Sequence, residues 1–284
     1  MRNPALFVAV LAGLLAAAAA DEGASCAFSM GECLDALGGG NVTTKAGHFP
    51  KAAIPTCAPQ MDTYIKSGAY LKAVETAART AYGPLGLNDT AKAAAEPGRK
   101  TQMVVFDIDE TLLSNVLQDP KLYASMGRRL AGAHEARDLV DFAAGGGGGI
   151  RGRFLMEGNA PALAPMLEVY KAVCAAGHPI ALITGRSENA RPATVANLEA
   201  AGYGKKCAEG TLSSAGKCCY NELILRAEGD NRLASIYKPG ARGELAKKYG
   251  WSVYAAFGDQ YSDFNGENPP AFGFKLPNPM YIIL

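Results

Sequence analysis

The stretch Gln102-Met-Val-Val-Phe106 is a short, mostly apolar run, and Asp107-Ile-Asp109-Glu-Thr111 follows it directly. A run of this length that ends in acidic residues is typical of a buried strand whose end reaches the surface. Two aspartates at a strand end can simply be turn or cap residues, because Asp is common there. Their meaning therefore depends on what the other strands carry.

Similar apolar runs recur downstream, and helical patterns separate them. We predict strands at 102–106, 179–183, 223–225, 253–257 and 272–276, with helices at 60–82, 161–176, 190–201 and 244–249. Buried strands that alternate with helices are typical of a parallel sheet covered on both faces. We therefore expect an α/β fold, a Rossmann-like three-layer sandwich with a central parallel sheet and an N-terminal helical extension.

Chemically active side chains follow several of these strands. In an open parallel sheet, the residues just after the strands meet at one edge, where ligands bind. The residues expected at this edge are Asp107, Asp109, Thr184, Gly185, Lys238, Asp259 and Asp263. Taken singly, Thr184 could be a helix cap and Lys238 a solvated base, so the prediction rests on their joint placement.

Four carboxylates beside one ammonium give this edge a charge of −3, which needs compensation. Two bare charges about 4 Å apart repel by roughly 4 kcal/mol at an effective dielectric near 20. A divalent cation would bring the sum to −1, and hard carboxylate oxygens suit Mg²⁺. The sequence therefore predicts a magnesium site.

Phosphoryl transfer is the chemistry that fits such a site. An aspartate can attack phosphorus to form an aspartyl-phosphate, and a second carboxyl can protonate the leaving alcohol and later activate water. Mg²⁺, Lys238, the Thr184 hydroxyl and strand-end amides can balance charge on the phosphoryl oxygens. A glycosyltransferase interpretation of Asp-x-Asp would leave Lys238 and the later aspartates unused.

Four ordered motifs resemble those of the haloacid dehalogenase (HAD) superfamily. They are Asp107-Ile-Asp-Glu-Thr111, Thr184-Gly-Arg186, Lys238 and Gly258-Asp-Gln-Tyr-Ser-Asp263. With Phe274-Lys-Leu-Pro-Asn-Pro-Met-Tyr281, they resemble more narrowly the plant acid phosphatase and vegetative storage protein family, of class B-like subclass IIIB type. The resemblance runs from about Gln60 to the C-terminus.

The resemblance implies a magnesium-dependent acid phosphatase acting on small phosphomonoesters. It implies Asp107 as nucleophile and Asp109 as acid/base, with Thr111 orienting the first loop. Phosphate would be bound by Thr184, Gly185 and Lys238. The metal would be bound by Asp107, the backbone carbonyl of Asp109, Asp259 and Asp263. Some storage proteins of this family lack the attacking aspartate, which this chain keeps. The alternatives are a storage protein with vestigial activity and a phosphotransferase.

Three further residues, in or near these motifs, are interpreted as structural. Arg186 is expected to pair with an acid below the site, Glu110 to be a helix-start acid, and His178 to be a turn residue.

The N-terminal region is expected to be a leader and a linker. Residues 1–20 join a basic Arg2 to an apolar stretch and small residues, as in a secretory signal peptide. An uncleaved anchor is the alternative. Residues 21–58 form a cysteine-containing extension, and 59–284 the HAD-like phosphatase domain. Within it, residues 113–159 form a small cap insertion that contains five consecutive glycines.

The chain has seven cysteines, which a secreted protein would expose to an oxidising compartment. Cys207, Cys218 and Cys219 could close a short disulfide loop or contribute to a zinc site. Cys174, within an apolar helical pattern, is expected to be a small core residue. Asn41 and Asn88 begin glycosylation motifs.

The overall charge limits the partners. The 284 residues include 28 Lys and Arg against 27 Asp and Glu, a net charge of +1. Because proteins that coat nucleic acids neutralise phosphates with a basic face, we expect no nucleic-acid partner. We expect a small phosphate ester as ligand, no stable membrane association, and a secreted, extracellular or vacuolar location. The sequence leaves the oligomeric state open, with a homodimer considered.

Overall fold

The protein is described by a computed structural model that covers residues 63–118 and 156–278. The predicted signal peptide at 1–20, the extension at 21–58 and most of the insertion at 113–159 lie outside these residues. So do Asn41 and the first three cysteines. The domain division therefore stays a prediction.

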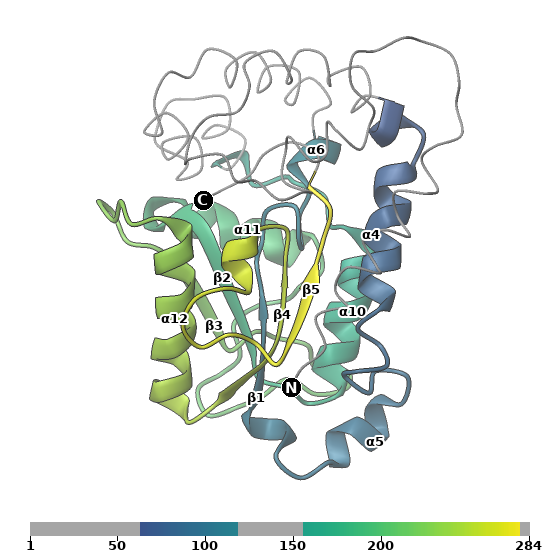
Figure 1. The fold of residues 1–284 in the computed structure, drawn as a ribbon, viewed down its shortest axis with the longest axis vertical. Coiled ribbons are helices and arrows are strands. Elements are labelled where there is room, and N and C mark those ends of the chain that lie inside the picture. The colour runs from purple at the N-terminus through teal and green to yellow at the C-terminus, as the bar shows by residue number, and fades with distance from the viewer. Residues whose placement is uncertain (1–62, 119–155, 279–284) are drawn as a thin grey trace.

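Five strands form one parallel sheet in the order β3-β2-β1-β4-β5 (Figure 1). The strands are β1 (Gln102–Phe106), β2 (Ile180–Ser187), β3 (Glu222–Arg226), β4 (Ser252–Gly258) and β5 (Phe272–Lys275). Because β1 pairs with both β2 and β4, Asp107 follows the central strand. The predicted parallel sheet is confirmed.

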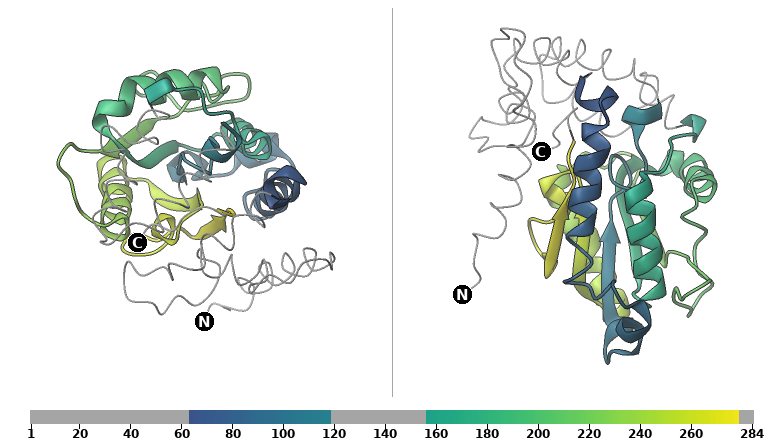
Figure 2. Two further views of the ribbon diagram at one scale, coloured as in Figure 1. Left: turned by 90° about the horizontal axis from the view of Figure 1, so that it is seen from above. Right: turned by 90° about the vertical axis from the view of Figure 1, so that its right-hand side faces the viewer.

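Helices cover both faces of the sheet, as the views from the front and from above show (Figures 1 and 2). Helix α12 lies on one face, and α4 and α10 lie on the other. The α-helices are α4 (Ala69–Arg79), α5 (Thr90–Ala95), α6 (Asn115–Gln118), α10 (Ala164–Ala175), α11 (Arg191–Ala200) and α12 (Ala234–Tyr249), and the 3-10 turns are η2 (Arg99–Thr101), η3 (Glu188–Ala190) and η4 (Tyr261–Asp263).

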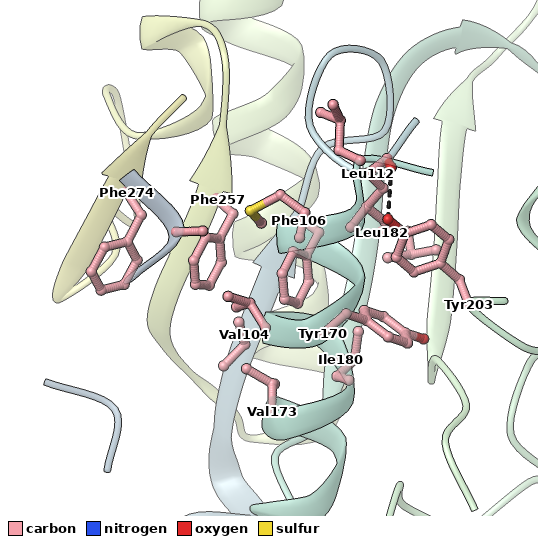
Figure 3. Packing of buried hydrophobic residues seen from close by; sticks show 14 of the residues in the cluster. Val104, Phe106, Leu112, Tyr170, Val173, Ile180, Leu182, Tyr203, Phe257 and Phe274 are labelled. Atoms are coloured by element: carbon pink, nitrogen blue, oxygen red, sulfur yellow. Dashed lines mark hydrogen bonds between the residues drawn. The ribbon is translucent and has the colours of Figure 1, made fainter. Parts of the chain in front are cut away.

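The side chains of β1 alternate between two hydrophobic clusters, as a strand covered on both faces requires. Phe106 joins the cluster of α10, where Phe257 stacks on it with ring centroids 4.7 Å apart and Tyr170 meets it edge-on (Figure 3). Met103 and Val105 join the opposite cluster with residues of α12. The predicted three-layer arrangement is confirmed.

Two helices differ from their sequence patterns. The helix predicted at 60–82 is interrupted at Gly68, whose φ of 80° is left-handed, and α4 begins after it. The helix predicted at 244–249 begins ten residues earlier, at Ala234. Pro239 suggests a break, but the burial of Tyr237, Lys238 and Ala241 against the sheet keeps the chain helical through it.

The described cysteines form two disulfides, Cys174–Cys218 and Cys207–Cys219. Cys174 is buried as predicted but is not an unpaired core residue. The zinc alternative for the other three is wrong, since all of them are in disulfides. The end of α10 lies against the segment before β3, which brings together cysteines 44 residues apart in sequence.

None of the described helices has the length and apolar character needed to cross a membrane.

Candidate active site

Asp107 lies directly after β1, where a tight loop begins. Its backbone N–H donates to the carbonyl of Phe257 at 3.0 Å, which ties it to β4. The N–H groups of Leu112 and Leu113 both donate to the Ile108 carbonyl at 2.9 Å and close the loop. The loop places the Thr111 hydroxyl 3.5 Å from Asp107 Oδ2. Thr111 is thus positioned next to Asp107, at the edge predicted.

Three carboxylates from two strand ends converge at this edge. Oxygen atoms of Asp107, Asp259 and Asp263 all lie within 4.8 Å of one another, and all three residues are buried. Asp263 accepts a hydrogen bond from the Gln260 N–H at 3.0 Å, which holds η4 against β4. A side chain at Gly258 would overlap the Asp263 carboxylate, so the close approach requires glycine there.

Lys238 of α12 joins this cluster from 131 residues away in sequence. Its Nζ lies 2.9 Å from Asp107 Oδ1 and 2.5 Å from Asp263 Oδ1. The side chain is buried. The ammonium therefore bridges two of the three carboxylates, and the structure brings together four of the seven residues that the sequence placed at one edge.

Burial makes the ionised form of the three carboxyl groups unfavourable in this cluster. Burial raises the pKa of Asp107 to about 7, with Lys238 opposing this shift and Asp259 adding to it. Burial likewise raises the pKa of Asp263 to about 6 and that of Asp259 above its usual range. Burial opposes the charge of Lys238, but Asp107 and Asp263 raise the pKa of Lys238 above its usual value. Buried carboxylate oxygens so arranged can hold a divalent metal ion.

Asp109 is not one of the three grouped carboxylates, and it pairs with Arg186. The guanidinium contacts it twice, with Nε 3.0 Å from Oδ2 and Nη2 2.8 Å from Oδ1. Asn115 Nδ2 donates to Oδ1 at 2.9 Å. The acid that Arg186 was predicted to balance is therefore Asp109, the predicted acid/base.

Glu110 lies before α6, and its carboxylate accepts the N–H of Asn115, the first residue of that helix, as predicted for a helix-start acid. It is fully buried and has a φ of 56°, unusual for a residue with a side chain. Its carboxylate accepts hydrogen bonds from Tyr70 Oη at 3.0 Å, Ser114 Oγ at 3.0 Å and the Asn115 N–H at 2.7 Å. Burial raises the pKa of Glu110 to about 7. Glu110 thus links the Asp107 loop to α4 and to the start of α6.

Thr184 and Gly185 lie within β2, which continues four residues beyond its predicted end. Phe106 of β1 pairs with Leu182, so Thr184 is level with the start of the Asp107 loop. Thr184 is buried, and its Oγ1 accepts a hydrogen bond from the Arg186 N–H at 3.2 Å.

Two amides beside Asp259 were not singled out from the sequence. Asn278 Nδ2 donates to Asp259 Oδ2 at 2.6 Å, and Gln260 Nε2 donates to the same oxygen at 2.5 Å. Both lie inside the motif phrases at 258–263 and 274–281, which is the signal that could have found them. They orient Asp259 toward the cluster.

Comparison with known proteins agrees with this arrangement. Residues 152–284 match the family model described as HAD superfamily, subfamily IIIB (acid phosphatase). The chain is 35% identical over 181 residues to "Acid phosphatase 1" of Solanum lycopersicum, covering 63% of this chain and 58% of that protein. It is 27% identical over 194 residues to "Vegetative storage protein 1" of Arabidopsis thaliana, covering 68% and 60%. The chain thus spans about three-fifths of the length of these relatives.

The fold is similar to that of a solved structure, the class C acid phosphatase from Bacillus anthracis. The TM-score is 0.51 at 19% identity, covering 79% of this chain and 85% of that one. At this identity the likeness concerns the fold alone. The chain is thus similar over residues 152–284 to the HAD superfamily, subfamily IIIB, and over about two thirds of its length to a plant acid phosphatase and a plant storage protein.

Proposed function

We propose that this chain is a magnesium-dependent acid phosphatase that hydrolyses small phosphomonoesters through an aspartyl-phosphate on Asp107. The observation that carries the proposal is the buried cluster of Asp107, Asp259 and Asp263 with Lys238 bridging two of them. Such a cluster is costly to bury unless cations neutralise it. A relative named an acid phosphatase supports the activity.

Each residue has a role that its position permits. Asp107 would attack phosphorus with a carboxylate oxygen, and the alcohol would leave on the opposite side. Lys238, Thr184 and the Gly185 amide would bind the phosphoryl oxygens. When held by the three carboxylates, Mg²⁺ would supply the positive charge that lets an anionic ester approach Asp107.

Asp109 would act as the acid/base, with Arg186 controlling its orientation. The bidentate contact with Arg186 favours the ionised carboxylate, which is the form needed to activate water in the second step. The first step needs a proton on Asp109. An acidic optimum fits this requirement, because low pH favours the protonated form.

A secreted or vacuolar location fits the chemistry of the cysteines. Two disulfides form in the described part of the chain, and disulfides persist in oxidising compartments. Relatives include a "Stem 28 kDa glycoprotein" of Glycine max, 31% identical over 182 residues, covering 63% of this chain and 59% of that protein. Asn88, one of the predicted glycosylation sites, is exposed.

The test is hydrolysis of p-nitrophenyl phosphate by the full chain between pH 4 and 8. We expect a chelator to abolish turnover and Mg²⁺ to restore it. Asp107→Asn should lower kcat by about 10⁴-fold or more, as loss of a nucleophile does. Glu244→Gln, which removes an exposed acid from the later part of α12, the helix that leads to the start of β4, is the matched control and should keep full activity.

Four outcomes would contradict the proposal in different ways. Full activity in Asp107→Asn would exclude the covalent mechanism, and full activity after chelation would exclude the metal. Negligible turnover of a broad panel of esters by the metal-loaded protein would favour a storage role, as the name of one relative suggests. Phosphorylated glycerol among the products would indicate a phosphotransferase.

A further inference from the structure

A second lysine, besides Lys238, lies at the edge of the sheet that holds the site. Lys275 is the last residue of β5, and its Cα pairs with Gly258, the residue before Asp259. Its neighbour Phe274 points into the hydrophobic cluster with Phe257. Because side chains alternate along a strand, Lys275 points to the opposite face, where η4 lies. Phe264, directly after η4, lies on that face beside Gly273.

The ammonium of Lys275 lies close to the acidic cluster without joining it. Its Nζ is 5.7 Å from the ring centroid of Tyr261 and donates to the Leu276 carbonyl at 2.8 Å. Burial lowers the pKa of Lys275, and the carboxylates of Asp259 and Asp263 oppose this shift. Lys275 forms no salt bridge with any residue in the ranges 63–118 and 156–278.

The two lysines of the site therefore differ in their capacity to bind an anion. Lys238 is held between two carboxylates, at 2.9 and 2.5 Å. Lys275 has three N–H donors, of which one is used within the described residues, by the neighbouring Leu276 carbonyl. A partly buried ammonium with unused donors is costly unless an anion or water completes its shell. The Tyr261 ring beside it is 41% exposed, so this side of the site opens to solvent.

We propose that Lys275 binds a second anionic group of the substrate, so that the site prefers phosphate esters that carry an additional carboxylate or phosphate. The inference rests on the proposed phosphatase function and concerns its choice of ester. The phosphoryl group would be bound by Lys238 and the metal site, and the additional anion by Lys275 beside Tyr261. Lys275 is thus a specificity residue rather than part of the chemical step.

A pair of aryl esters tests this preference. The carboxylate of 4-carboxyphenyl phosphate is charged, and its matched partner 4-carbamoylphenyl phosphate is neutral and of nearly the same shape. We expect the wild type to show a higher kcat/KM for the charged ester. The ratio of the two kcat/KM values should fall about tenfold in Lys275→Met, mainly through KM, as loss of one charge-assisted contact predicts. Lys275→Arg should keep the ratio.

Controls separate this inference from the proposed function. Lys100→Met removes an exposed lysine of η2, at the opposite end of β1, and should leave both esters unaffected. A second measurement needs no variant: added salt should bring the wild-type ratio toward one, because it screens the additional charge.

The contradicting outcomes are distinct. Hydrolysis of both esters with the same ratio in wild type and Lys275→Met would overturn the role of Lys275 and leave the phosphatase function standing. A wild-type ratio that does not depend on salt would do the same. Failure of the wild type to hydrolyse any ester would overturn the proposed function itself.

Discussion

At the carboxyl edge of the sheet three buried carboxylates share one buried ammonium. At the amino edge a buried guanidinium bonds to an imidazole, to a backbone carbonyl and to the half-exposed carboxylate of Glu96. Arg99 Nε donates to the Ala93 carbonyl at 2.9 Å, and its Nη1 lies 2.9 Å from His178 Nε2. His178 Nδ1 lies 2.7 Å from the Gln102 carbonyl. Both edges bury polar groups, but only the carboxyl edge buries like charges together.

The pKa values show the consequence of this difference. Burial lowers the pKa of His178 to about 4, so the imidazole is neutral at ordinary pH and the amino edge is balanced. At the carboxyl edge burial raises the pKa values of Asp107 and Asp263, and a cation is needed to hold both ionised. The comparison separates polar contacts that stabilise the fold from a site arranged for a ligand. His178 does lie between α10 and β2, as a turn residue would, but its side chain is fully buried.

The largest expected effect is the difference in stability and turnover between substitutions of the two buried arginines, Arg186 and Arg99. Arg186→Met would leave Asp109 buried without its counter-ion, and we expect the free energy of unfolding to fall by about 3–5 kcal/mol. Arg99→Met removes hydrogen bonds and should cost about 1–3 kcal/mol. Turnover should fall by about 10²-fold in Arg186→Met, because the acid/base loses its orientation. Denaturant unfolding and p-nitrophenyl phosphate kinetics measure both effects.

Arg99→Met is the activity control for Arg186→Met, because Arg99 lies at the far end of β1. The Arg99→Met variant should keep kcat within about twofold of wild type. An equal loss of kcat in the two variants would show that the edges are not functionally distinct. Asp109→Asn combined with Arg186→Met should regain stability without regaining turnover, because the unpaired charge is gone.

The next effect is in the pH dependence of stability, which should have opposite signs at the two edges. In the folded, metal-free protein, Asp107 and Asp263 keep their protons up to about pH 7 and pH 6, respectively. In the unfolded chain, both carboxyl groups lose their protons near pH 4. Their contribution to stability is therefore lost as pH rises through that window. His178, with a folded pKa of about 4, contributes stability that is lost as pH falls from 6.5 toward 4.

Difference curves separate the two contributions. The free energy of unfolding of the wild type, minus that of His178→Gln, should rise by roughly 3 kcal/mol between pH 4 and 6.5. The corresponding difference between the wild type and Asp107→Asn should fall as pH rises. Saturating Mg²⁺ should remove that fall, because it binds the ionised carboxylate. Curves with the same sign for both variants would contradict the comparison.

The smallest effect concerns two buried tyrosines near the carboxyl edge. Tyr70→Phe removes the hydroxyl that donates to Glu110, and we expect a loss of about 1 kcal/mol in unfolding free energy. Tyr170→Phe is the matched control, because the buried Tyr170 hydroxyl has no hydrogen-bond partner in the described part of the chain and its removal should cost nothing. Thermal unfolding of the two variants measures the difference. Equal stability would mean that α4 does not anchor the Asp107 loop through Glu110.

The parts of the fold predictable from sequence are those governed by local pattern. The strand at 102–106 is correct to the residue, because it is a continuous buried run. The start of α12 was missed because Pro239 suggests a helix break, whereas packing of the helix against the sheet overrides that local preference. At the site, the contact of Glu110 with the start of α6 was predicted from local pattern, but its hydrogen bond with Tyr70, 40 residues away, was not.

The order of residues along the chain was sufficient to predict that Asp107 and Asp259 meet, because each directly follows a strand and parallel strands bring their carboxyl ends to a common edge. Tertiary structure alone decided which cation pairs with which carboxylate. Arg186 pairs with Asp109, and Lys238 with Asp107. The same holds for the cysteine pairs. The physical reason is that strand register and side-chain packing determine distances between remote groups, and neither is encoded in a local pattern.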